Sequence, residues 1–138
     1  MKVFFDTNVL LDVLTGREPF AEDSARCLRL CEQGVHQAFA SSLSLVNIFY
    51  ILRKAIGREK ALECLRQIRV VCRIIPVDDD VIAHSLESSF RDFEDAVQSY
   101  CALSYAMSYI ITRDISDYGF SAVPAISPHD FLDIYLHQ

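Results

Sequence analysis

Three aspartates in separate segments are the residues of this chain whose type and spacing could do chemistry. Asp6 directly follows a short apolar run, and Asp114 follows another near the end of the chain. Asp95 lies in the first turn of a predicted helix between them. Carboxylate oxygens are ligands that Mg²⁺ and Mn²⁺ prefer, and such ions can activate water to hydrolyse a phosphodiester. The three aspartates therefore predict a divalent-metal site with this chemistry.

Each acid taken alone also has an ordinary structural explanation. Asp6 could cap a helix, and Asp95 would be favoured by its charge at a helix N-terminus. Asp114 and Asp117 are typical turn residues. Asp6 favours the metal site over these structural explanations, because a charged side chain directly after a buried strand is costly to desolvate unless it is paired or bound to metal.

The elements that must position these acids follow from the apolar pattern. Short apolar runs predict strands at 2–5, 37–41, 70–75, 109–112 and 124–126. Amphipathic segments predict helices at 9–14, 19–34, 44–56, 58–69, 78–88, 93–107 and 128–136, with Ser42 or Ser44 as the cap of the third. This alternation predicts an α/β three-layer helix–sheet–helix sandwich with a central, mostly parallel sheet of four or five strands. Ligands of such sheets bind beyond the carboxyl ends of the strands.

Length and composition indicate one globular unit, and we expect residues 1–138 to form a single domain. No apolar stretch reaches the roughly 20 residues of a membrane-spanning helix, and an acid follows the first short apolar run where a secretory signal would continue. We therefore expect a cytoplasmic protein with no membrane partner. The five cysteines contain no CxxC pair, which predicts reduced thiols. A net charge of −6 argues against nonspecific coating of nucleic acid, so any such contact must be local.

Four segments in order resemble the PIN-domain family, in the bacterial branch with a Glu-Asp-Ala motif that is related to VapC-type toxin ribonucleases. They are Phe5–Asp12, Ser41–Lys54, Asp92–Gln98 and Ile111–Tyr118. The resemblance extends over almost the whole chain. It implies a PIN-like fold and a metal-dependent endoribonuclease that uses Mg²⁺ or Mn²⁺, and it suggests the toxin of a toxin–antitoxin pair.

The resemblance also implies roles for individual residues. Asp6, Asp95 and Asp114 would bind the metal, with Asp117 as an additional or alternative catalytic acid. Asn8 and Thr112 would orient these carboxylates through hydrogen bonds.

One position departs from the family pattern. Many PIN domains carry a glutamate in the helix after the second strand, where this chain has Asn47. Glu94 could supply the missing charge, and one or two metal ions both remain compatible with the sequence. Arg113 is the basic residue within the acidic motifs, and it should point away if Asp114 points inward.

Basic residues gather around Gly57, at the predicted junction of two helices. They are Arg53, Lys54, Arg58 and Lys60. They could bind the phosphate backbone of a substrate, or they could form an ordinary solvated helix junction.

Two other functions are compatible with parts of the pattern. Asp6-Thr7-Asn8 is similar to the nucleophile loop of aspartyl-phosphate phosphatases, although Asn8 cannot act as the acid that such enzymes place there. A degenerate PIN domain could bind RNA or a partner protein without catalysis. The family resemblance further implies a homodimer and a small antitoxin protein whose basic side chain enters the acidic site.

Overall fold

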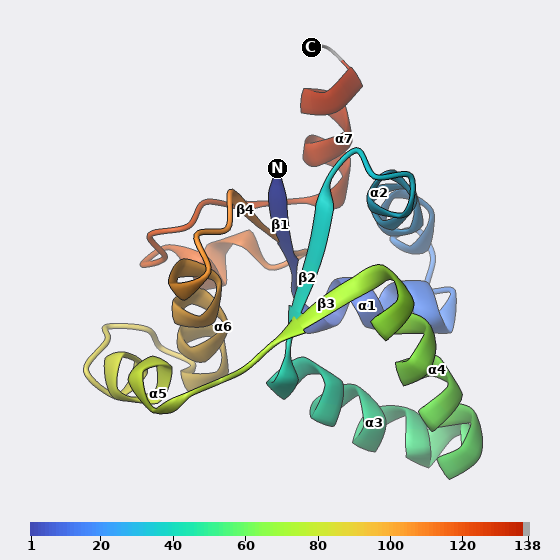
Figure 1. Ribbon diagram of the computed structural model, residues 1–138, viewed down its shortest axis with the longest axis horizontal. Helices are drawn as coiled ribbons and strands as arrows, with labels where there is room; N and C mark the ends of the chain where they lie inside the picture. Colours follow the sequence, from blue (N-terminus) through green and yellow to red (C-terminus); the bar gives the residue numbers. More distant parts are fainter. Residues whose placement is uncertain (137–138) are drawn as a thin grey trace.

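The computed structural model describes residues 1–136, which form a five-stranded parallel sheet between two layers of helices (Figure 1). The strand order is β3-β2-β1-β4-β5. The strands are β1 (Lys2–Phe5), β2 (Gln37–Ser41), β3 (Cys72–Ile75), β4 (Tyr109–Ile111) and β5 (Ala125–Ile126). This architecture confirms the predicted α/β sandwich and its parallel sheet.

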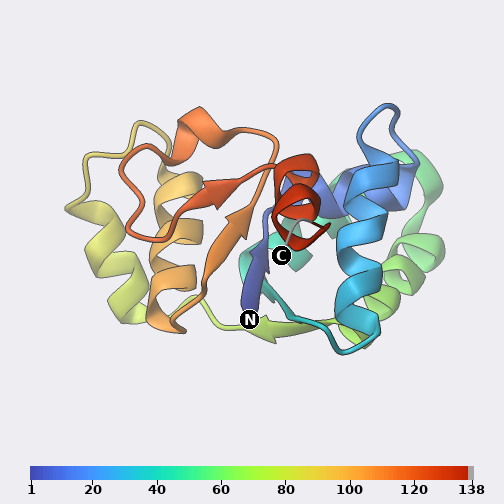
Figure 2. The same cartoon turned by 90° about the horizontal axis from the view of Figure 1, so that it is seen from above.

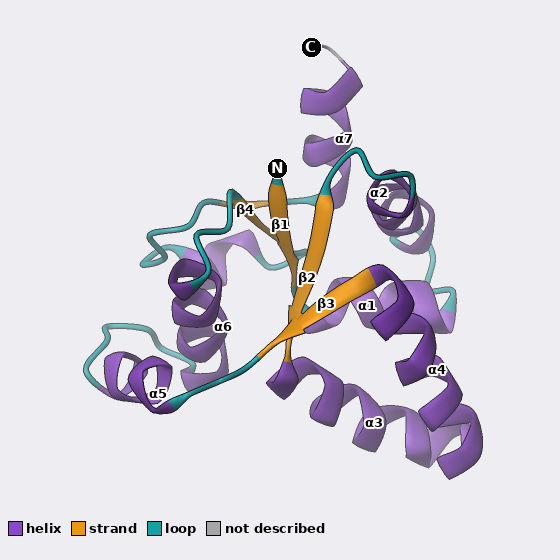
Figure 3. Cartoon of the chain, in the orientation of Figure 1, coloured by secondary structure: helices purple, strands orange, loops and turns teal. Residues whose placement is uncertain are grey.

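The two helical layers are unequal (Figures 2 and 3). The larger layer contains α1 (Thr7–Thr15), α2 (Ala21–Glu32), α3 (Ser42–Ile56), α4 (Arg58–Val71) and α7 (Pro128–Leu136). The smaller contains α5 (Asp79–Leu86) and α6 (Phe93–Ser104), with the short 3₁₀ helix η1 (Ile115–Tyr118) packed against α6. None of the described helices combines the length and the apolar character that a membrane crossing needs.

The central strand β1 is buried on both faces. Val3 and Phe5 pack against the larger layer and Phe4 against the smaller, all with no exposed surface. Successive side chains of a strand point to opposite faces, so an unbroken apolar run suits a strand that is covered on both sides.

The chain leaves β1 and β4 toward opposite layers. Asp6 leads from β1 into α1 in the larger layer, whereas Asp114 leads from β4 into η1 beside α6. Because β1 and β4 are neighbours, these diverging connections create a topological switch point, where parallel sheets bind ligands.

Two local predictions were wrong. The strand expected at 70–75 begins only at Cys72, because α4 continues through Val71. Val70 is 84% exposed, so it does not occupy a buried strand position despite its β-branched side chain. The cap of α3 is Ser41, whose hydroxyl accepts a hydrogen bond from the backbone N–H of Ser44 at 3.1 Å.

The turn between α3 and α4 depends on a backbone conformation at Gly57 that other residues rarely adopt, with φ 84° and ψ 168°. We expect Gly57→Ala to lower the free energy of unfolding by about 1–3 kcal/mol through backbone strain alone, since a new Cβ would meet no atom within 4 Å. Thermal and urea denaturation would measure the change. Gly119→Ala is the matched control, because Gly119 has right-handed φ and only an ordinary contact at 3.6 Å. Equal stability of Gly57→Ala and the parent would contradict the assignment of strain.

Candidate active site

Asp6 lies at the junction between β1 and α1 and is only 7% exposed. Its carboxylate accepts hydrogen bonds from the backbone N–H of Thr7 and the hydroxyl of Thr112, both at 2.8 Å. The side-chain amides of Asn8 and Gln98 donate longer bonds, at 3.3 and 3.4 Å. Burial raises the pKa of Asp6, although hydrogen bonds from Thr112, the backbone of Thr7, Tyr118 and Gln98 oppose the rise.

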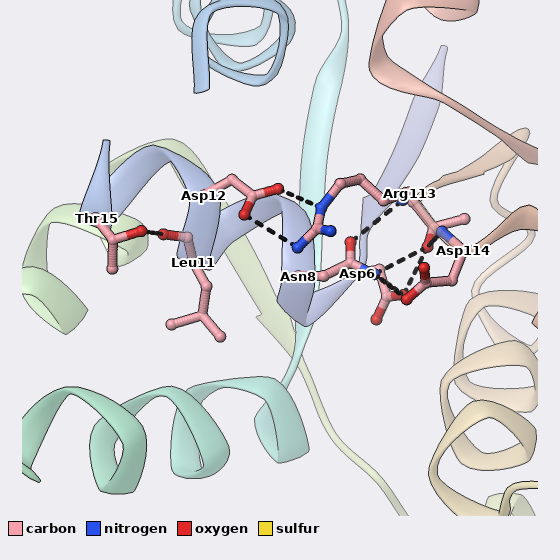
Figure 4. A network of polar contacts seen from close by, with 8 residues as sticks. Asp6, Asn8, Leu11, Asp12, Thr15, Arg113 and Asp114 are labelled. Atoms are coloured by element: carbon pink, nitrogen blue, oxygen red, sulfur yellow. Dashed lines mark hydrogen bonds and ion pairs between the residues drawn. The ribbon is translucent and has the colours of Figure 1, made fainter. Parts of the chain in front are cut away.

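Asn8 joins the carboxylates that follow β1 and β4 (Figure 4). Its Nδ2 donates to Asp114 at 3.0 Å as well as to Asp6, and its Oδ1 accepts from the backbone N–H of Arg113 at 3.3 Å. The hydroxyl of Thr112 accepts a further bond from the backbone N–H of Asp114 at 3.0 Å. The end of β4 is therefore held to the start of α1 at the switch point.

Arg113 turns away from these carboxylates, as expected if Asp114 faces them (Figure 4). Its guanidinium forms two hydrogen bonds with the buried Asp12 of α1, at 2.6 and 3.1 Å. It also lies over the ring of Phe20, 4.4 Å from the centroid. The cation nearest in sequence to Asp114 is thus occupied elsewhere.

Asp95 brings α6 to the same site. Burial, together with the smaller effect of negative charges on neighbouring carboxylates, raises the pKa of Asp95 to about 7. Those neighbours are Asp92, Asp6, Asp117 and Glu94. Asp95 and the exposed Asp117 therefore lie close enough to interact electrostatically. We call Asp6, Glu94, Asp95, Asp114 and Asp117 the acidic cluster.

Asn47 contacts the edge of the acidic cluster. Its Nδ2 donates to Glu94 Oε1 at 2.9 Å and so links α3 to α6. Burial raises the pKa of Glu94, an effect that the hydrogen bond from Asn47 opposes. The two residues therefore act as a pair within the structure.

A buried polar network behind Asp6 was absent from the sequence-based predictions. Gln98 has no exposed surface, and it donates to the hydroxyl of Ser44 at 2.7 Å and accepts from that of Ser41 at 2.5 Å. The Ser44 hydroxyl also shares a bond of 2.7 Å with that of Thr7. The available sequence signal is the spacing of Gln98, three residues after Asp95 and so on the same side of the helix.

Tyr118 is a second residue that sequence reasoning missed. It is 4% exposed, and its hydroxyl interacts with the Asp6 carboxylate, which lowers the pKa of Asp6 and raises that of Tyr118. The hydroxyl faces the acidic cluster, because the charges of Asp6 and Asp95 add to the effect of burial in raising its pKa. A tyrosine directly after Asp117 gives no sequence signal that its hydroxyl is buried against a carboxylate.

The basic residues around Gly57 lie at the far end of α3 from the acidic cluster (Figure 1). Ten residues of helix separate Asn47 from Gly57, a distance of about 15 Å. Arg58 is paired with Glu59 at 2.9 Å, and all four basic side chains are exposed.

The chemistry of the acidic cluster suits a hard divalent cation. Its ligands are all oxygens, and within residues 1–136 no lysine or arginine forms an ion pair with them. The nearest approach of three potential ligand groups in the described chain is elsewhere, at the exposed His129, Asp130 and Asp133 of α7. In the acidic cluster the amide of Asn8 lies between Asp6 and Asp114, so a cation there would replace one of its hydrogen bonds.

The chain is similar in sequence to known proteins. Residues 2–116 match the PIN domain family. The chain is 27% identical over 123 residues to Ribonuclease VapC1 of Aquifex aeolicus, covering 86% of this chain and 85% of that protein.

Similar folds occur among solved structures. One is VapBC2 from Rickettsia felis bound to a DNA fragment from its promoter, with a TM-score of 0.73, 15% identity and coverage of 92% of this chain and 98% of that one. Another is a toxin–antitoxin complex from Klebsiella pneumoniae, with a TM-score of 0.68, 20% identity and coverage of 91% and 97%.

The pKa of Asp95 makes the stability of the metal-free protein depend on pH. The folded protein keeps a proton on Asp95 up to about pH 7, whereas the unfolded chain loses it near 3.8. Stability from this group is therefore full below pH 3.8 and is lost as the pH rises through about 7. Because Asp95 is partly exposed, we expect the loss to be on the order of 1 kcal/mol.

Asp95→Asn should flatten this part of the profile. Melting temperatures measured in EDTA between about pH 4 and 8 would test it. Asp80→Asn, at an exposed position of α5, serves as the control and should keep the parent's slope. A slope that survives in Asp95→Asn would show that another group is responsible.

Proposed function

Because the chain belongs to the PIN-domain family, we propose that it is a Mg²⁺- or Mn²⁺-dependent endoribonuclease whose single domain hydrolyses phosphodiester bonds at the acidic cluster. The observation that carries the proposal is the convergence of uncompensated carboxylates at the switch point of the sheet. The similarity to Ribonuclease VapC1 supports RNA as the substrate.

In this proposal Asp6, Asp95 and Asp114 bind the metal. When bound, the ion would activate water and offset negative charge on the phosphate. Thr112 and the backbone N–H of Thr7 fix the rotamer of Asp6 through bonds of 2.8 Å, so that its oxygens keep their direction when the metal leaves or enters. Asn8 sets the spacing between Asp6 and Asp114.

Asp117 and Glu94 supply additional negative charge. Both carboxylates act electrostatically on Asp95. Asp117 is an exposed residue of η1, from which it can contact a ligand or remain in solvent. Asn47 holds Glu94 by a hydrogen bond. Glu94 would therefore supply, close to position 47, the negative charge that other PIN domains obtain from a glutamate at that position.

Arg53, Lys54, Arg58 and Lys60 remain our proposed contacts to the RNA backbone. They are solvent-exposed cations on a chain of net charge −6, and phosphate contacts need such local positive charge. Their distance from the acidic cluster means that they would bind nucleotides remote from the scissile bond.

We further propose that the protein is a toxin that forms a homodimer and binds a small antitoxin protein. The similar Klebsiella pneumoniae structure is a toxin–antitoxin complex. Exposed apolar side chains support protein partners, since Val46, Tyr50 and Ile51 of α3 are each more than half exposed. An apolar pocket of about 420 Å³ between α1, α2 and α4 offers a second such surface.

The principal test of this function is cleavage of RNA. We expect the parent to cut single-stranded RNA with Mn²⁺ or Mg²⁺ and not with EDTA, and Asp6→Asn to lose more than about a hundredfold in rate, beyond the loss typical of outer-shell partners. Gel analysis of labelled RNA and of matched DNA would measure it. Asp80→Asn, at an exposed position of α5 outside the acidic cluster, should cut like the parent. Cleavage that persists in EDTA or in Asp6→Asn would overturn the proposal.

The second candidate function is a PIN domain that binds without cutting, and Asn47 is the observation that favours it. If Asn47 occupies a ligand position, Asn47→Glu should tighten Mn²⁺ binding by about tenfold, or 1.4 kcal/mol, by adding an anionic oxygen. Calorimetric titration with Mn²⁺ would measure this. Asn47→Gln is the neutral control. Tight Mn²⁺ binding by the parent without any RNA cleavage would favour the binding function, and unchanged affinity in Asn47→Glu would remove position 47 from the site.

A further inference from the structure

A pocket of about 430 Å³ adjoins the acidic cluster on the side of Asp114. Its walls come from three segments that are far apart in the sequence: the start of α2, the loop after β4 and the start of α7. The lining residues are Pro19, Phe20, Asp23, Arg113, Asp114, Ser127, Pro128 and His129. Asp114 belongs both to this wall and to the hydrogen-bonded group around Asn8, so the pocket and the acidic cluster share this residue.

Arg113 gives the pocket a rigid, flat wall. Asp12 binds its guanidinium through two bonds at 2.6 and 3.1 Å, and Asp12 itself is only 1% exposed. The ring of Phe20 lies against the guanidinium at 4.4 Å. Arginine planes and aromatic rings are the surfaces on which proteins stack unpaired nucleobases.

The charges of the pocket select against a phosphate. The positive charge of Arg113 is matched by Asp12, while Asp23 and Asp114 add two carboxylates to the wall. A neutral base is compatible with these carboxylates, because its amino groups donate hydrogen bonds to such acceptors. His129, 3.3 Å from Asp23, adds a second flat side chain at the rim.

We propose that this pocket binds the nucleobase of a nucleotide that flanks the scissile phosphate, stacked on the Arg113–Phe20 pair. The proposal rests on the proposed function as a ribonuclease. A base can enter only when it is unstacked from its neighbours, so the pocket selects single-stranded or looped RNA.

The test combines changes in the RNA with changes in the pocket. A short oligoribonucleotide that the parent cuts at one bond is prepared with an abasic residue at each position near that bond. We expect one flanking position to lower kcat/KM by about tenfold, within the range of a lost base–aromatic stack. Phe20→Leu and His129→Ala should themselves lower kcat/KM on the intact RNA, and the further abasic penalty should shrink to less than about twofold because the contact is already lost.

Controls separate this contact from a structural effect. His129 is 70% exposed, so His129→Ala tests the pocket even if Phe20→Leu loosens the fold. His84→Ala, at an exposed position of α5, should keep the tenfold abasic penalty. A parent that cuts RNA while both pocket variants retain the full abasic penalty would overturn the base-binding pocket and leave the ribonuclease intact. A parent that cuts no RNA with Mn²⁺ would overturn both.

Discussion

A carboxylate at the end of a buried strand has lost most of its water, and the protein must compensate it with its own donors. Asp6 carries this constraint, and its donors come from α1, from the end of β4 and from α6. Those elements are one helix from each helical layer and the strand next to β1. The hydrogen bonds to Asp6 therefore form only when both helical layers are packed on the sheet. Gln98, buried behind Asp6, also donates to Ser44, so α3 must be in place as well.

The repulsion among the carboxylates explains the arrangement around them. Arg113 would cancel part of the negative charge if it faced Asp114, yet Asp12 and Phe20 hold it on the other side of the loop. Burial, and after it the remaining charge, raises the pKa of Asp95. Within residues 1–136, the groups that hydrogen-bond to Asp6 are neutral amides and hydroxyls. Such an arrangement suits the divalent cation that we propose for this site, because the protein's own cation is directed elsewhere.

The sequence predicted the parallel sheet well, because its strands are short, apolar and separated by helical segments. It also placed Asp6 and Asp114 near each other, since the carboxyl ends of parallel strands meet at one edge. It did not predict the network of Gln98, Ser41 and Ser44, whose partners come from different helices and depend on tertiary packing. The start of β3 was misjudged because the β-branched pair before Cys72 follows a helix that has already begun, and that helix overrides local preference.

The pairing of β1 with β4 also has a consequence for biosynthesis. Thr112, which donates to Asp6, is 106 positions further along the chain, and Asn8 reaches Asp114 over the same separation. During translation the N-terminal half can collapse around β1 and β2 without these contacts, because domains grow from the N-terminus and β4 is made late. A nascent chain, or one truncated before β4, thus lacks the assembled acidic cluster. Synthesis of β4 and of the residues directly after it is the step that creates the site.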